Sequence, residues 1–159
     1  MAGDMFLDIE GVKGESKDEK FKDKIDIDAF SLDCTNIGSM GRGGGGGTGK
    51  ADFQDVSVTK QIDGSSHELL KSVATGKHFP KATISCRKAG GDNQHVYLVI
   101  TMEDVFCSSF NTSGSGELPM EQFSLNYAKI KYEYKEQTKQ GSGSGQKIAG
   151  YDRELNKPI

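Results

Sequence analysis

The sequence lacks several features by which other classes of protein are recognised. Its 159 residues contain no tryptophan, three prolines and three cysteines. The longest uninterrupted apolar run covers residues 96–100, far short of the roughly 18 residues that a membrane-spanning helix needs. The first residues carry neither the basic stretch nor the apolar stretch of a Sec signal peptide. We therefore expect no membrane insertion and no Sec export.

Positive charge is not in excess either. Twenty basic residues stand against 23 acidic ones, for a net charge of -3, so the chain has no overall field that gathers phosphate. We expect no nucleic-acid partner. Cys34, Cys86 and Cys107 are odd in number and lack C-x-x-C spacing, which argues against a disulfide framework or a zinc knuckle. The three histidines show no ligand spacing, so no metal site is expected.

One glycine-rich motif resembles a nucleotide-binding loop. Residues 44–50 fit the pattern G-x-x-x-x-G-K. However, Ala51 follows the lysine where Mg²⁺ would need a hydroxyl, and the next residues read as a strand rather than a helix. These two features oppose a P-loop hydrolase. No serine elbow or activated nucleophile is apparent, and we expect no catalytic residue, no cofactor and no enzymatic activity.

The remaining pattern is mainly β. Apolar alternation between glycine clusters predicts strands over residues 5–10, 24–37, 51–62, 82–88, 95–109, 120–135 and, more weakly, 147–153. One helix is predicted, beginning with the S-x-x-E capping box of Ser65 and Glu68 and ending at Gly76. We expect this helix to cap the sheet.

The parity of the apolar residues indicates where strands bend. Side chains alternate between the faces of a strand, so an apolar series changes parity only where a residue is inserted. Such changes predict β-bulges near residues 28–29 and 128–129. Long bulged strands favour an antiparallel β-barrel of two curled sheets with one capping α-helix. We expect a single domain over residues 1–159, with a glycine-rich extended loop at 39–49 and a C-terminal tail at 136–159.

Several short strings occur together in a characteristic order. They are VKGES at 12–16, TGK at 48–50, QDVSVTK at 54–60, TGKH at 75–78, RKAGG at 87–91, VFCSS at 105–109 and SLNY at 124–127. In this order and spacing, from about Phe6 to Pro158, the chain resembles the haemolysin-coregulated protein (Hcp) family, the tube proteins of bacterial type VI secretion systems. The chain departs from many family members in one respect: Phe30 and Leu32 stand where those members carry tryptophan.

The resemblance implies a structural protein. It implies hexameric rings that stack into a hollow tube, which lies inside a contractile sheath, carries a VgrG-type spike and holds effector proteins. The tube would assemble in the cytoplasm and leave through the type VI apparatus, serving effector delivery and virulence. The alternative is a monomeric secreted ligand-binding β-barrel.

Three sets of residues are candidates for function. Ser31 lies between Phe30 and Leu32, so it faces away from the core if they are buried. It looks like the family's lumen-facing cargo site, and the alternative is an ordinary solvated residue. The loop 39–49 is long for a connection between strands. Five residues in and beside it are expected to contact the next ring: Met40, Gly43, Gly47, Thr48 and Lys50.

The third set lies on the strand predicted over 95–109, which is apolar on both faces. Its Tyr97 and Val99 would form a contact between subunits. The alternative is a strand whose two faces are both buried in the core.

Overall fold

The computed structural model describes residues 4–36, 50–88, 94–137 and 143–159. Eleven strands and one helix occur in these residues. They are β1 (Asp4–Ile9), β2 (Ile25–Asp26), β3 (Ala29–Ser31), β4 (Cys34–Thr35), β5 (Asp52–Phe53), β6 (Val56–Gln61), α1 (Ser66–Thr75), β7 (His78–Lys88), β8 (His95–Ser113), β9 (Met120–Gln137), β10 (Gly143–Asp152) and β11 (Lys157–Pro158).

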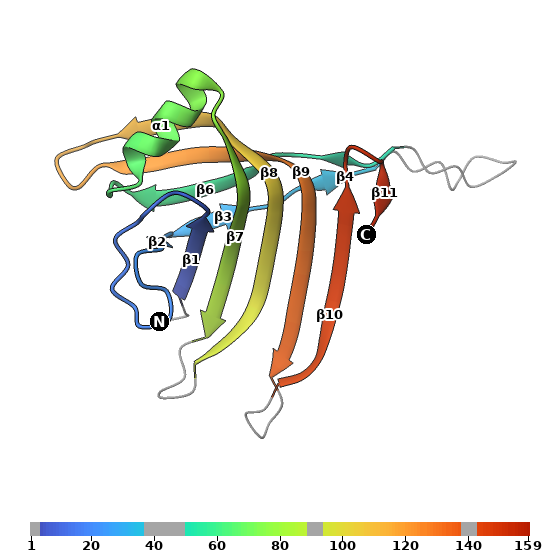
Figure 1. Ribbon diagram of the computed structural model, residues 1–159. Coiled ribbons are helices and arrows are strands. Elements are labelled where there is room, and N and C mark those ends of the chain that lie inside the picture. The colour runs from blue at the N-terminus through green and yellow to red at the C-terminus, as the bar shows by residue number, and fades with distance from the viewer. Residues whose placement is uncertain (1–3, 37–49, 89–93, 138–142) are drawn as a thin grey trace, which may run out of the picture.

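The strands form two layers whose directions cross (Figure 1). The first layer contains β1, β7, β10 and the adjoining halves of β8 and β9, residues 95–103 and 129–137. The second layer contains β3, β6 and the other halves of β8 and β9, residues 105–113 and 120–127. Because β8 and β9 run through both layers, these two strands connect the layers and fold one over the other. Every strand pair is antiparallel, and the predicted fold class is confirmed.

Residues 25–31 connect β1 of the first layer with β6 of the second layer. Ile25 and Asp26 pair with β1, whereas Ala29–Ser31 pair with β6. The switch is abrupt, because the N–H of Ile27 donates to Met5 at 3.2 Å and the N–H of Asp28 donates to Thr59 at 2.8 Å. The hydrogen-bonded circuit β1–β7–β8–β9–β6 therefore returns to β1 through one segment. The parity change predicted as a bulge near residues 28–29 is instead this exchange of partner strand.

The second prediction, a bulge near residues 128–129, is also wrong, because β9 contains no inserted residue there. The register of β8 with β9 runs without interruption from Leu98 opposite Tyr134 to Cys107 opposite Leu125. The change of buried face nevertheless occurs where it was expected, at Ala128, and it occurs opposite Asp104 in β8 as well. Asp104 has a φ of 52°, and Pro80 lies alongside in β7. The strands change face together at this row, which is where the sheet folds over. The register shifts of β8 lie elsewhere, at Tyr97 and Ser108.

Helix α1 ends as predicted but begins differently. Gly76 adopts the left-handed conformation, with a φ of 72°, and its N–H donates to the carbonyl of Ser72. The predicted capping box is wrong, because Ser65 makes no side-chain bond to the helix. Its hydroxyl donates to Asp63 at 2.5 Å instead, and Asp63 also accepts the N–H of Ser65. Leu69 and Ser72 form the buried side of the helix.

A buried ion pair fixes the start of α1 to the barrel. Lys60 of β6 and Glu121 of β9 are both fully buried, with Nζ and Oε2 at 2.7 Å. The same ammonium contacts Asp63 at 2.9 Å and Ser66 at 3.2 Å. The hydroxyl of Ser66, the first residue of α1, donates to Glu121 at 2.8 Å. Burial of these charges is therefore compensated within one network that joins two strands to the helix.

The strand predictions were correct in type and less so in extent. The runs 24–37 and 51–62 are each divided, into β2, β3 and β4 and into β5 and β6. They are divided because each piece pairs with a different neighbour. Strands β7, β8 and β10 extend beyond the predicted bounds. No helix in the described part of the chain is long and apolar enough to span a membrane.

Candidate functional site

The outward side of the second layer carries rows of uncharged polar side chains. One row crosses four strands in register: Ser31 of β3, Ser57 of β6, Ser124 of β9 and Ser109 of β8. The next row is Ala29, Thr59, Gln122 and Asn111 on the same strands. Directly opposed residues in a sheet project from the same face. We call the seven polar members the serine face: Ser31, Ser57, Thr59, Ser109, Asn111, Gln122 and Ser124.

The strands present these side chains because their other side is apolar. Phe30, Val58, Phe123 and Phe110 form the row behind the serine face, and all four belong to or pack against the core. Alternation then turns the intervening residues outward. Ser31, Ser109, Asn111 and Gln122 are exposed, while the other three are partly buried. The prediction that Ser31 faces away from the core is confirmed.

Hydrogen bonds between neighbouring strands hold several of these groups. The hydroxyls of Ser109 and Ser124 lie 2.6 Å apart, and Ser108, the inserted residue of β8, lies 2.7 Å from Ser124. Ser108 also donates to the carboxylate of Asp55 at 2.5 Å, which accepts a second bond from Asn126 at 2.7 Å. The carboxylate beside the serine face is therefore already engaged. The surface offers hydroxyl and amide groups, which exchange bonds with water at little net gain in free energy.

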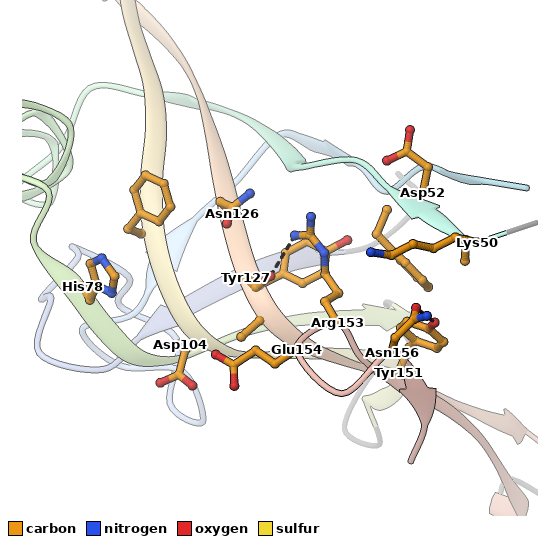
Figure 2. A pocket seen from close by; sticks show the side chains of 14 residues that line it. Lys50, Asp52, His78, Asp104, Asn126, Tyr127, Tyr151, Arg153, Glu154 and Asn156 are labelled. Carbon is orange, nitrogen blue, oxygen red and sulfur yellow. Dashed lines mark hydrogen bonds between the residues drawn. The ribbon is translucent and has the colours of Figure 1, made fainter.

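We call the row of Asp104 and Ala128, at which the sheet folds over, the fold-over row. A cleft of about 690 Å³ lies at one end of this row (Figure 2). Its charged lining residues are Lys50, Asp52, Asp104, Arg153 and Glu154. Because both signs are present and they come from three separate parts of the chain, the cleft has no field of one sign for an ionic ligand. Among the described residues, no group of three or more His, Cys, Asp and Glu side chains is arranged to hold a metal ion.

The side chains in this cleft attach the C-terminal turn to the barrel. Arg153 donates to the carbonyl of Tyr127 at 2.8 Å, and its guanidinium lies 5.2 Å from the centre of the Tyr127 ring. The Tyr127 hydroxyl donates to the carbonyl of Gln54 at 2.9 Å. Phe53 stacks on Tyr151 with ring centroids 4.9 Å apart. The side chains that line the cleft are therefore engaged in contacts that hold the C-terminal turn against the barrel.

Burial raises the pKa of three side chains in the core and so favours their protonated forms. Burial raises the pKa of the Cys107 thiol to about 11 and that of the Tyr127 hydroxyl to about 12. Burial also raises the pKa of Cys86. A thiol reacts as its thiolate, so both of these cysteines stay protonated and unreactive near neutral pH. Cys86 and Cys107 thus act as small buried residues of the core, whereas Cys34 is exposed.

The structure places the other predicted functional residues in different regions. Met40, Gly43, Gly47 and Thr48 lie outside the described residues. Lys50 is exposed and contributes to the cleft. The β4–β5 pair sets Cys34 opposite Phe53 and Thr35 opposite Asp52, so the described strands that flank segment 37–49 are neighbours.

Tyr97 and Val99 do not lie on one continuous face. Tyr97 is the inserted residue of a register shift opposite Cys86 and Arg87, and it packs partly against the core. Val99 is half-buried between Ser85 of β7 and Glu133 of β9. Their role in a contact between subunits stays a prediction.

Sequence reasoning identified Ser31 but missed the rest of the serine face. The signal was present, because Ser57, Thr59, Gln122 and Ser124 alternate with buried residues of β6 and β9. What a single sequence does not contain is the register that aligns these strands into continuous rows.

Solved structures with the same architecture define the class. The chain matches a structure described as a type six secretion system protein with a TM-score of 0.91 and 27% sequence identity, over 99% of each chain. It also matches Hcp1 from Salmonella typhimurium with a TM-score of 0.80 and 33% identity, over 100% of each chain. The folded-over barrel with one helix is thus shared with a type VI secretion protein and with an Hcp protein.

Sequence comparison assigns the family. A family model described as "Type VI secretion system effector, Hcp" matches residues 6–134. The chain is 46% identical over 147 residues to the protein hcp1 of Pseudomonas aeruginosa strain PAO1, covering 91% of each sequence. The chain therefore belongs to the Hcp family of type VI secretion proteins, and the family resemblance predicted from its sequence is confirmed.

Proposed function

We propose that six copies of this chain form a ring, that rings stack into a hollow tube, and that the serine face lines the lumen. The observation that supports this role is the composition of that face. Four strands in register present hydroxyl, amide and methyl groups with no ionised side chain in either row. An outer surface in a chain with 27% charged residues would be expected to include charges.

A neutral polar wall suits a conduit for physical reasons. A charged wall would hold cargo of opposite sign and exclude cargo of like sign, because charges in a narrow, partly desolvated space interact strongly. Hydroxyl and amide groups instead remain wetted and form bonds that exchange readily with those of water. Ser31 then contacts cargo through bonds that exchange with those of water.

Membership of the family supports the wider assembly that we propose. The tube lies within a contractile sheath, carries a VgrG-type spike, holds effector proteins, and is expelled from the cytoplasm through the type VI apparatus. In this function the chain acts as a structural subunit rather than an enzyme. The residues that carry this function are therefore surface residues.

Contact between successive rings is assigned to the segment around residues 39–49. Strands β4 and β5, which flank this segment in the sequence, pair with each other. We expect that replacing residues 39–49 by a two-residue turn leaves rings intact and shortens the tubes seen by electron microscopy. Tubes of unchanged length would contradict this assignment.

The alternative, a ligand-binding barrel, is disfavoured by the interior. Leu7, Ile25, Ile84 and Ile100 are fully buried within the barrel, together with Leu125 of the second layer. These side chains occupy the space in which a ligand would bind.

Native mass spectrometry of the purified chain tests the proposal. A mass of six subunits, with rings and stacked rings by electron microscopy, is the expected result. A chain that stays monomeric at high concentration, and that is not exported by cells with an active type VI apparatus, would contradict it.

A further inference from the structure

The serine face continues past its two rows toward the cleft. Asn126 follows Ser124 by two residues in β9 and therefore projects from the same side of the layer. Phe106 of β8 lies opposite Asn126, and His78 of β7 lies opposite Phe106. All three side chains line the cleft (Figure 2). We call Asn126, Phe106 and His78 the third row.

Asp55 lies at the end of this row, next to the start of β6. It precedes Ser57 by two residues and is partly buried, so alternation places it on the side of the serine face. Its Oδ1 accepts the side-chain amide of Asn126 at 2.7 Å, and its Oδ2 accepts the hydroxyl of Ser108 at 2.5 Å. The carboxylate is therefore held in one position at the border between the serine face and the third row.

The negative charge of Asp55 is not neutralised within the described part of the chain. Both of its hydrogen-bond donors are uncharged, and no Lys, Arg or His nitrogen of the described residues lies within 4.0 Å of its carboxylate. The other buried or partly buried acids of the described residues all have a Lys or Arg nitrogen within that distance: Asp4, Asp8, Asp18, Asp23, Asp63, Glu68, Glu121, Glu133 and Asp152. A carboxylate that is partly withdrawn from water without a counter-charge favours binding of a cation.

The groups around Asp55 suit one class of cation. The two oxygens of a carboxylate accept about four hydrogen bonds between them, and side-chain donors of the described residues occupy two of these positions in Asp55. Asn126 donates through its nitrogen, which leaves its amide oxygen as an acceptor. The ring of Phe106 stacks with His78 at a centroid distance of 5.4 Å and adds a flat aromatic surface. A guanidinium group is planar, carries five N–H donors and stacks on aromatic rings, so it matches this combination.

We propose that Asp55, Asn126 and Phe106 bind an arginine side chain of the protein cargo. This inference rests on the proposed function and names the chemistry by which the lumen selects its cargo. The uncharged rows of the serine face bind either sign of charge weakly, whereas the carboxylate of Asp55 adds a preference for positive charge. Because every subunit repeats the site, a ring presents several equal sites to one cargo molecule, which strengthens binding of a cargo with several arginines.

Peptide binding to the unmodified chain is the first test. Isothermal titration calorimetry at fixed ionic strength compares hexa-arginine with hexalysine and with hexa-citrulline, which has nearly the shape of hexa-arginine but no charge. We expect hexa-arginine to bind more tightly than hexalysine, because only a guanidinium combines paired donors with stacking. Hexa-citrulline should bind least. Equal affinities of the arginine and lysine peptides would overturn the inference.

Two variants and a control locate the binding. Asp55→Asn removes the charge with little change in size, and Glu10→Gln removes the charge of an exposed acid that follows β1 in the first layer. We expect Asp55→Asn to weaken hexa-arginine binding about fivefold or more, and Glu10→Gln to leave it unchanged. Phe106→Leu should weaken hexa-arginine binding more than hexalysine binding, because leucine offers no ring face. Equal effects of Asp55→Asn and Glu10→Gln would overturn the inference.

Footprinting of the unmodified chain avoids any effect of the substitutions on folding. Carbodiimide-activated coupling of glycine ethyl ester labels accessible carboxyl groups, and mass spectrometry measures the labelling of each one. Hexa-arginine should protect Asp55 and leave the labelling of Glu10 unchanged. Equal protection of both, or none at Asp55, would overturn the inference while leaving the proposed ring intact. An unmodified chain that stays monomeric by native mass spectrometry would overturn the proposed function instead.

Discussion

Arg87 and Asp18 form a two-pronged ion pair across 69 residues of sequence. Nη1 lies 3.0 Å from Oδ1 and Nη2 lies 2.6 Å from Oδ2, while Nη2 also reaches Asp4 at 2.8 Å. The guanidinium is buried against the stacked rings of Phe6 and Phe21, whose centroids are 4.3 Å apart. The pair fastens the connection between β1 and β2 onto the outer side of the first layer.

This ion pair makes the free energy of unfolding depend on pH in the acid range. Its hydrogen bonds and charge lower the pKa of Asp18 from 3.8 to about 2. Because the folded value lies below the unfolded one, the contribution of Asp18 is complete above about pH 4 and is lost as the pH falls toward 2. Asp18→Asn should lower the free energy of unfolding by about 2 kcal/mol at pH 7, and this deficit should shrink between pH 4 and pH 2.

Urea unfolding at fixed protein concentration over this pH range measures the effect. Glu19→Gln is the matched control, since Glu19 is an exposed acid in the same connection. A deficit for Asp18→Asn that stays constant down to pH 2 would show that the pair acts through shape rather than charge.

We expect loss of one partner of the Lys60–Glu121 pair to destabilise the chain strongly. Replacement of both partners by apolar residues should destabilise it little. Lys60→Met leaves the buried carboxylate of Glu121 without its cation and should destabilise the chain by about 3–5 kcal/mol. The double variant Lys60→Met, Glu121→Leu removes both charges and should recover most of that loss. The urea midpoints of the two variants give the comparison, and a double variant as unstable as the single one would contradict the expectation.

Sequence patterns predicted the elements of this fold because those patterns are local. Alternation gave the strands and placed Ser31 outward, and Gly76 marked the end of the helix. The parity change near Ala128 also marked the fold-over row correctly. Its cause was not visible, because the change occurs in neighbouring strands together and needs no inserted residue in β9.

Local sequence patterns did not predict which distant segments pair with each other. Nothing near Ile27 and Asp28 indicates that their successive N–H groups donate to different strands. The Arg87–Asp18 pair and the rows of the serine face depend likewise on long-range register. Functional residues were found where a single strand carried the signal and missed where several strands together form the site.

Two positions with positive φ should respond oppositely to substitution. Gly76 has a φ of 72°, and a Cβ added there would meet open space, so Gly76→Ala should cost about 1 kcal/mol through backbone strain alone. Asp104 has a φ of 52° and is exposed, so Asp104→Gly should be neutral or stabilise by up to about 0.5 kcal/mol. Thermal unfolding measures both.

Gly114→Ala serves as the control for these variants. Its added Cβ would meet only Pro119, at ordinary contact distances of 3.7 and 3.9 Å. We expect no loss of stability there. A destabilisation by Gly114→Ala equal to that of Gly76→Ala would show that the left-handed conformation does not set the cost, because the lower entropy of the unfolded chain by itself favours alanine.

Charges placed on the serine face should change cargo selection without changing assembly. Ser31 is exposed and faces away from the core, so Ser31→Asp and Ser31→Lys should both form rings. In a ring each substitution repeats in every subunit, and the charges act together inside the lumen. An effector carrying an acidic tag should then be retained at least tenfold less by Ser31→Asp, a change of about 1.4 kcal/mol, and more by Ser31→Lys.

The sign of the effect distinguishes a lumen from an ordinary solvated surface. Co-purification of the acidic-tagged effector and of a basic-tagged form of the same effector, at equal ionic strength, should give opposite orders for the two variants. Ser31→Ala should resemble the unmodified chain because it adds no charge. If both charged variants retain both forms equally, Ser31 does not face the cargo, since a charge that lines a confined path must act on whatever passes along it.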